Sequence, residues 1–213
     1  AKLSKINGGN IKEQNKALVE GVNSYNKQNK TAYAAGEILR DVAAVSDGIA
    51  ISYAGYPEKL GEAVTAAKDL GMSLGDVDKI ADSLLNFEQS IAKGMEAELL
   101  TGKDLNLEKA RQAALNNDLE TVAKELTAQG VTSAEFASMN RIQQQKMAEA
   151  MGMSKDQMAK MLLQQKLSSG ISEDSLSAAE KQTLESLKQE EAQERFTKSI
   201  EQLQQALAPI VGF

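Results

Sequence analysis

The feature that most constrains this chain is a run of apolar residues spaced alternately three and four positions apart. Within residues 73–103 this run consists of Val77, Ile80, Leu84, Phe87 and Ile91. A 3.5-residue repeat places such side chains in a narrow stripe on one face of a helix, the arrangement by which helices pack along each other. Ser73 is suited to cap the start of this helix and Gly102 to end it. We therefore predict one helix over 73–103 whose stripe binds another helix.

The rest of the chain repeats this pattern of helix, small-residue break and helix. Asn10 is suited to cap a helix over 10–29, although the apolar face of that segment is weak. A second helix is predicted over 31–54, and Pro57 suits the first turn of a third that runs to about residue 70. Thr132 and Glu135 have the spacing of a capping box.

Composition favours helices packed side by side. Aromatic residues make up only 4% of the 213 residues, and there is no tryptophan. Aliphatic residues and methionine must then provide most of the apolar burial. We predict an all-α fold of long amphipathic helices with coiled-coil-like stripes plus a small helical module, in an extended arrangement. The predicted regions are an N-terminal helical arm over 1–57, a long coiled-coil-like region over 58–102, a multi-helix module over 103–170 and a long C-terminal helix over 171–213.

A second apolar stripe lies near the end of the sequence. It consists of Phe196, Ile200, Leu203, Leu207 and Ile210. Together with the first stripe it predicts partner binding between helices, including a homo-oligomer of the chain. A trimer is one of the arrangements that the mixed residue types of this stripe allow.

The sequence lacks the residues of the commonest active sites. It contains no histidine and no cysteine, which removes the usual general base and the usual ligands of transition metals. We expect no enzyme, no catalytic residue and no cofactor or metal site. The formal net charge of −6 gives no basic footprint for nucleic acid, and no apolar run is long enough to span a bilayer.

Six of the eight methionines lie between Met139 and Met161. Methionine side chains adapt to irregular partners, so this cluster could line a binding groove. Ordinary core is the commoner meaning of such a cluster, and a groove is the alternative that the sequence leaves open.

Residues 80–126, IADSLLNFEQSIAKGMEAELLTGKDLNLEKARQAALNNDLETVAKEL, resemble the tail-length tape measure proteins of long-tailed bacteriophages. The resemblance continues in residues 140–161 and in the segment FTKSIEQLQQALAPI over 196–210, and covers about residues 31–213. It implies a mainly helical structural protein that lies in the lumen of the tail tube and sets tail length. The implied location is the virion tail, assembled in the host cytoplasm.

The resemblance also implies the partners. These are further copies of the chain, the tail tube, and the tail tip or baseplate. Contact with the host membrane is implied only for segments outside residues 1–213, because we expect the sequence to be a piece of a longer protein. The alternative is a helical binding module, such as an effector or scaffold of a secretion-type machine.

Overall fold

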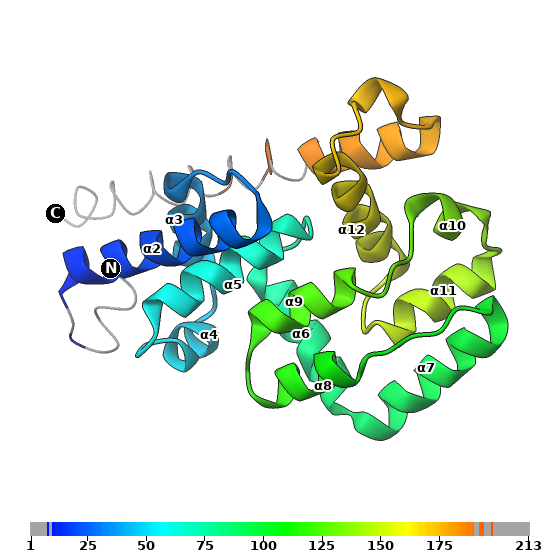
Figure 1. The fold of residues 1–213 in the computed structure, drawn as a ribbon, viewed down its shortest axis with the longest axis horizontal. Coiled ribbons are helices and arrows are strands. Elements are labelled where there is room, and N and C mark those ends of the chain that lie inside the picture. The colour runs from blue at the N-terminus through cyan, green and yellow to red at the C-terminus, as the bar shows by residue number, and fades with distance from the viewer. Residues whose placement is uncertain (1–7, 9, 190–191, 194–196, 198–213) are drawn as a thin grey trace, which may run out of the picture. The chain divides into compact units, whose positions relative to one another are not determined.

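The computed structural model describes residues 8, 10–189, 192–193 and 197, and every regular element among them is a helix (Figure 1). The chain divides into two compact units, Ala1–Lys166 and Leu167–Phe213, here called unit 1 and unit 2. The predicted all-α class is confirmed for the described residues.

Unit 1 is a bundle of short helices. They are α2 (Ile11–Asn29), α3 (Ala35–Ala44), α4 (Asp47–Ser52), α5 (Pro57–Asp69), α6 (Leu74–Leu85), α7 (Phe87–Thr101), α8 (Glu108–Leu115), α9 (Leu119–Thr127), α10 (Ser133–Ser138), α11 (Arg141–Ala150) and most of α12 (Lys155–Ser168). Unit 2 contains a 3₁₀ turn, η1 (Glu173–Ser175), and a helix over residues 178–189.

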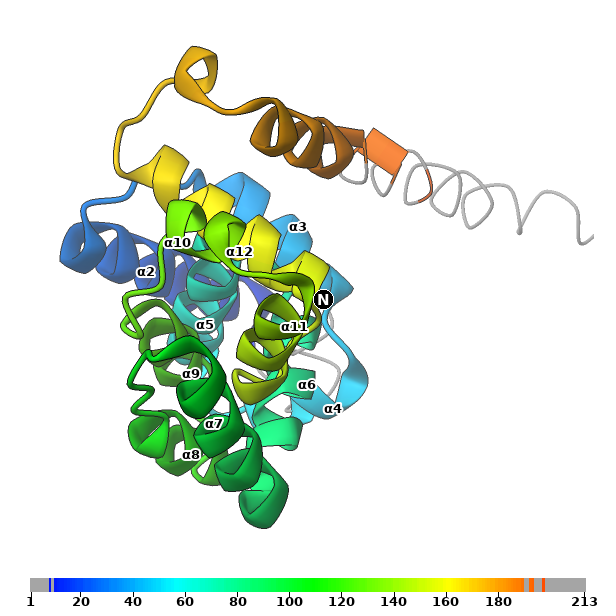
Figure 2. The ribbon, with the colours of Figure 1, turned by 90° about the vertical axis from the view of Figure 1, so that its right-hand side faces the viewer.

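Helix α5 forms the centre of unit 1. Eight consecutive residues, from Leu60 to Ala67, are buried, so the helix is covered on every side rather than along one stripe. It contacts α2, α3, α6 and α9, and Figures 1 and 2 show α2 and α3 running beside it. The weak apolar face of α2 is therefore covered by α5, which explains why such a polar segment is helical.

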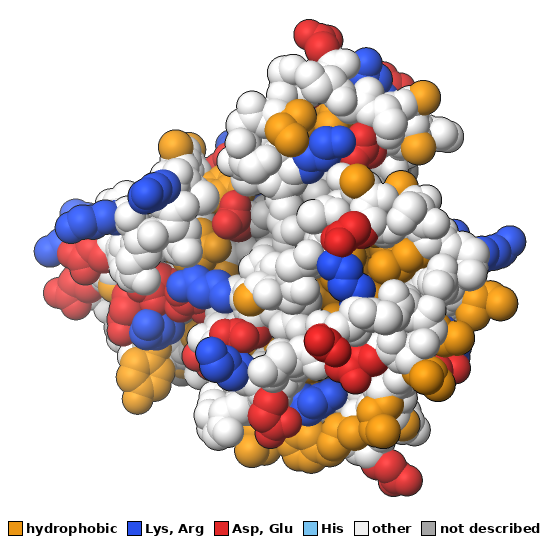
Figure 3. Space-filling model, turned by 45° about the vertical axis from the view of Figure 1, so that its right-hand side comes forward, with side chains coloured by type: hydrophobic (Ala, Val, Ile, Leu, Met, Phe, Trp, Pro, Cys, Tyr) orange, Lys and Arg blue, Asp and Glu red, His pale blue; other side chains and the backbone are white. Residues whose placement is uncertain are grey.

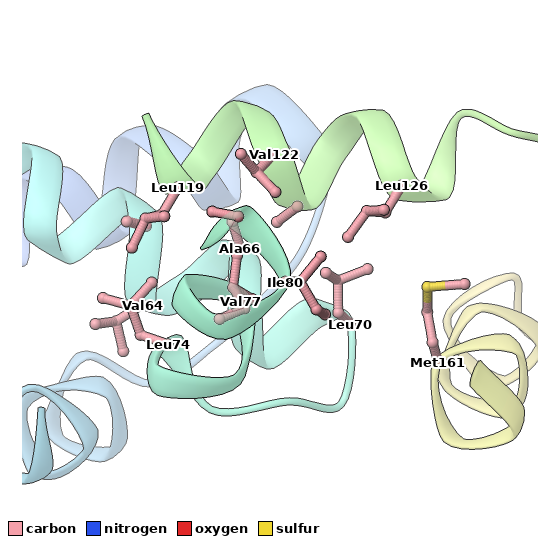
Figure 4. Packing of buried hydrophobic residues seen from close by; sticks show 14 of the residues in the cluster. Val64, Ala66, Leu70, Leu74, Val77, Ile80, Leu119, Val122, Leu126 and Met161 are labelled. Carbon is pink, nitrogen blue, oxygen red and sulfur yellow. The ribbon is translucent and has the colours of Figure 1, made fainter. Parts of the chain in front are cut away.

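The core extends from α5 to the helices that follow it. Figure 4 shows Val64 and Ala66 of α5 facing Val77 and Ile80 of α6, with Leu119, Val122 and Leu126 of α9 above them. Met161 of α12 belongs to the same buried cluster. The methionines at 147, 151, 153, 158 and 161 are buried in it too, which supports the ordinary-core interpretation of the methionine-rich segment.

Two glycines allow α2 and α5 to cross at close range. A Cβ atom at Gly21 would collide with the backbone carbonyl of Glu58, and one at Gly61 would collide with the carbonyl of Leu18. The two backbones are therefore in contact without side chains between them, and each glycine is required by the approach of the opposite helix.

The single helix expected over 73–103 is wrong, because the chain breaks at Asn86. The capping box of Ser73 with Asp76 starts α6 as predicted, but α6 ends at Leu85. Asn86 leaves the helical conformation (φ −76°, ψ 76°), and its side chain accepts a hydrogen bond from the Gln89 backbone N–H. Asparagine offers this alternative to a continuous helix because its short side chain can satisfy N–H groups at a new helix start. Gly102 ends α7 in the left-handed conformation (φ 69°), as predicted.

Two other predictions, one on a helix and one on the arrangement of the helices, need correction. The helix expected over 31–54 is divided into α3 and α4, because Ser46 caps a new start by accepting from the Ile49 backbone N–H. The extended arrangement is also wrong for unit 1, whose helices fold back on α5. The capping box at Thr132 and Glu135 is confirmed.

Candidate functional site

The structure separates the first apolar stripe into a buried part and an exposed part. Val77, Ile80 and Leu84 of α6 are at most 1% exposed and pack inside unit 1. Phe87 and Ile91 of α7 are 44% and 47% exposed. The first three residues thus contribute to the protein's own core, and only the two on α7 remain available to a partner. The second stripe, at Phe196, Ile200, Leu203, Leu207 and Ile210, lies outside the described residues.

Helix α7 is amphipathic in the reverse of the usual sense. Its buried residues are the small ones, Ser90, Gly94 and Ala97. Its exposed residues include the large apolar ones, and four of them, here called the α7 ridge, follow each other at four-residue spacing: Phe87, Ile91, Met95 and Leu99. Leu99 is 86% exposed. Figure 3 shows hydrophobic side chains gathered along the lower edge of this face, the end of the molecule at which Figures 1 and 2 place α7.

Small residues on the inner face bring α7 close to α11, and the long Arg111 side chain of α8 reaches the same face. Arg111 is only 9% exposed. It donates from Nε to the Ser90 hydroxyl (2.9 Å) and from Nη2 to the Ser90 carbonyl (3.3 Å). On the other side, Gln143 of α11 donates to the Leu100 carbonyl (2.7 Å). These bonds fix α7 on the unit with its ridge turned outward, at the edge seen in Figures 1 and 2.

The row of residues beside the α7 ridge is acidic. A helix surface consists of parallel rows of residues spaced by four, and the neighbouring row contains Glu88, Ala92, Glu96 and, at its end, Leu100. All four are exposed, and Glu96 also pairs with Lys146 of α11 at 3.0 Å. This surface combines an apolar ridge with carboxylates beside it, so it suits an apolar ridge from another helix together with positively charged flanking groups.

A group of charged residues lies between α5 and α9, here called the α5–α9 ion cluster: Lys59, Glu62, Glu120 and Lys124. Lys59 pairs with Glu62 at 2.7 Å, and Lys124 pairs with Glu120 at 2.6 Å. Burial acts to raise the pKa of Glu62, but hydrogen bonds from Lys59 and Ser24 outweigh it and hold that pKa below the ordinary value. Glu62 therefore stays ionised at neutral pH, and its hydrogen bond with Ser24 joins α5 to α2.

Sequence reasoning identified Phe87 and Ile91 but missed Met95 and Leu99. Continuing the 3.5-residue spacing from Ile91 leads to Gly94 and Glu98, so the stripe seemed to stop there. The signal that could have found the ridge is a constant spacing of four from Phe87 to Leu99, beside small residues at 90, 94 and 97.

In the part of the chain that the structure describes, no helix combines the length and the apolar character needed to cross a membrane. Nor do three or more aspartate or glutamate side chains converge in it to hold a metal ion.

Comparisons of the sequence and structure with protein-family models, curated proteins and solved structures give no match for this chain.

Proposed function

We propose that this chain is a structural component of a long-tailed bacteriophage tail, of the tape measure type, and that it binds a partner helix through the α7 ridge. The proposed role is structural and not enzymatic. The observation that carries the binding role is the reversed amphipathicity of α7. Exposing four large apolar side chains while burying small ones costs hydrophobic free energy, which a partner that covers the ridge would recover.

The shape of the α7 ridge favours a helical partner. Rows of side chains spaced by four pack into the grooves of a second helix in the commonest class of helix contact. The ridge spans three turns, which matches a partner helix of similar length. The resemblance to tape measure proteins suggests that this partner belongs to the tail tube or the tail tip.

The charge beside the ridge favours a partner helix with lysine or arginine flanking its apolar face. Glu88 has no ion-pair partner among the described residues, and Glu96 remains 46% exposed despite its contact with Lys146. Two copies of α7 packed ridge to ridge would bring acidic rows of the same sign together, which disfavours self-pairing. The occupant that we propose is therefore a basic-flanked helix from another tail protein.

Two synthetic helical peptides test the binding role directly. Both carry leucines at four-residue spacing, and they differ only in having lysine or glutamate beside the leucines. We expect fluorescence polarisation to show at least tenfold tighter binding of the lysine peptide. The double variant Ile91→Gln with Leu99→Gln should abolish this binding, whereas Leu115→Gln with Ile142→Gln, two residues 62% exposed on α8 and α11, should retain it.

Equal binding of both peptides, or binding that survives the ridge variant, would overturn the proposed docking surface. Light scattering on the same proteins tests whether a second copy of the chain occupies the ridge instead. A stable oligomer of the wild-type chain that dissociates in the ridge variant would mean that a second copy covers the ridge.

The tape measure role is tested in the phage that encodes the chain. An in-frame deletion of residues 10–166 should shorten the tail, as measured by electron microscopy of purified virions. If this region is stretched as helix in the tail, the loss should be on the order of 200 Å, at about 1.5 Å per residue. A clearly smaller loss would mean that unit 1 stays compact in the tail, and an unchanged length would refute the tape measure role.

A further inference from the structure

A cleft of about 220 Å³ lies between the connection from α4 to α5 and the turn from α8 to α9. It is lined by Ser52, Tyr53, Tyr56, Lys59, Asn116, Asn117, Asp118 and Glu120. This volume is smaller than the roughly 300–1,000 Å³ of pockets that bind drug-sized ligands. The cleft therefore suits a small group of about one ring.

One wall of the cleft is held in place by Tyr53, which is 7% exposed. Its hydroxyl donates to the Asn117 carbonyl (3.1 Å) and accepts from the Leu119 backbone N–H (3.3 Å). Asn117 itself adopts the left-handed conformation (φ 55°) that ends α8. The turn is thus fixed from within the protein, so a ligand would meet a preformed wall.

The charged residues of the cleft already have partners. Lys59 and Glu120 belong to the α5–α9 ion cluster, where each pairs with the opposite charge. The Asp118 carboxylate caps α9 by accepting from the Thr121 backbone N–H (3.1 Å) and from the Thr121 hydroxyl (2.7 Å). These groups keep the cleft polar, but none of them is a single unpaired charge that would select an ion.

Four neutral polar side chains are left to face a ligand. The side chains of Ser52, Tyr56, Asn116 and Asn117 make no hydrogen bond to the residues that the structure describes. The two amides and two hydroxyls offer both donors and acceptors. Tyr56 lines the cleft and is 64% exposed, so an aromatic side chain is accessible to a ligand there.

We infer that this cleft binds a single neutral sugar ring. A pyranose has hydroxyl groups that both donate and accept, matching the free amides and hydroxyls. It also has an apolar C–H face that can lie on the Tyr56 ring. Lys59, Glu120 and Asp118 already have partners within the protein, so the cleft offers no free charge to an ion and a neutral polyhydroxyl ligand fits it best.

The test is a titration of the ¹⁵N-labelled chain with glucose, galactose and N-acetylglucosamine, followed by amide NMR. We expect saturable shifts of the amides at 116–118 with at least one sugar, at millimolar affinity. Methyl glycosides of the same sugars show whether the natural ligand is a free sugar or a sugar unit within a glycan. If they bind as well as the free sugars, the ligand is a sugar unit within a larger glycan; if only the reducing sugars bind, it is a free sugar.

Substitutions of the cleft side chains without hydrogen bonds test whether the sugar binds in this cleft. Tyr56→Ala and Asn116→Ala should each weaken the sugar at least fivefold, whereas Ile142→Ala, at an exposed site on α11, should leave its affinity unchanged. Because Tyr56 is largely exposed, Tyr56→Ala should keep the thermal midpoint of the wild type, and Ser52→Val provides a second variant. Absence of saturable shifts with all three sugars, or equal shifts with the diamine putrescine, would overturn the inference.

Discussion

Gly21 of α2 lies against the backbone carbonyl of Glu58 in α5, with no room for a side chain between them. Gly21→Ala should therefore force the two helices apart and destabilise the protein by about 3 kcal/mol, as overpacked sites do. Urea unfolding followed by circular dichroism measures this loss as a lower transition midpoint.

Gly36→Ala is the matched control, because Gly36 is also helical but a Cβ there would meet no atom within 4 Å. Alanine has the higher helix propensity, so this variant should be more stable by roughly 0.5 kcal/mol. Destabilisation of the two variants by the same amount would show that the close crossing of α2 and α5 does not exist in solution.

The two parts of the first apolar stripe should respond differently to truncation. Leu84 is 1% exposed, so Leu84→Ala should cost about 2–5 kcal/mol by removing core contacts and leaving a cavity. Ile91 is 47% exposed, and Ile91→Ala should cost less than about 1 kcal/mol in the isolated chain. Similar losses at both positions in chemical unfolding would indicate that Ile91 is buried in the folded chain as Leu84 is, and would contradict the exposed α7 ridge.

Arg111 should be irreplaceable by lysine, although the charge is the same. Its planar guanidinium reaches the hydroxyl and the carbonyl of Ser90 together, and an ammonium group cannot reproduce this fork. Arg111→Lys should cost roughly 1.5–3 kcal/mol, the range for hydrogen bonds to charged groups. Arg40→Lys, at an exposed position of α3, should stay within about 0.5 kcal/mol of the wild type in the same assay. Identical stability of the two variants would contradict the role of Arg111 in holding α7.

Three tyrosines should make stability fall at alkaline pH. Burial raises the pKa of Tyr53 to about 12, and burial together with hydrogen bonds to the Asp69 carboxylate raises the pKa of Tyr25 and Tyr33 above the ordinary value. Above pH 10 the unfolded chain loses phenol protons that the folded chain still holds, so unfolding becomes easier as pH rises.

The stabilising contribution of Tyr53 should be complete below pH 10 and lost as the pH rises towards about 12. Absorbance at 295 nm during alkaline titration measures phenolate formation, and circular dichroism measures unfolding. Tyr53→Phe should reduce the slope of stability against pH above pH 10. Ionisation of all tyrosines near pH 10 without unfolding would contradict the buried environments of these side chains.

Local signals predicted helix ends better than helix contacts. The caps at Asn10, Ser73 and Thr132 and the proline start at Pro57 depend on nearby atoms only, and all four lie where the sequence placed them. The break at Asn86 was missed because apolar spacing runs unchanged through it. A single asparagine is only a weak indication of a helix break. The chain breaks at Asn86 because α6 and α7 pack against different neighbours.

The α7 ridge was only half predictable for a related reason. A prediction from helical periodicity places the larger apolar residues on the buried face. In the structure, contacts with Arg111 and α11 instead bury the face of α7 that carries Ser90 and Gly94. That choice depends on residues distant in the sequence. The central position of α5 was equally hidden, since its buried residues include the polar Glu62 and Thr65. Both find partners within α5 itself: Glu62 pairs with Lys59, and the Thr65 hydroxyl donates to the Gly61 carbonyl.

The dependence of α2 on α5 has a consequence for synthesis on the ribosome. Translation proceeds at about 5–20 residues per second, so several seconds pass between the emergence of Asn29, the end of α2, and that of Asp69, the end of α5. During that interval α2 has a sparse apolar face and no helix to cover it, so the nascent segment stays largely unfolded. Stable packing of α2 begins only when α5 has left the exit tunnel and Gly21 meets its partner.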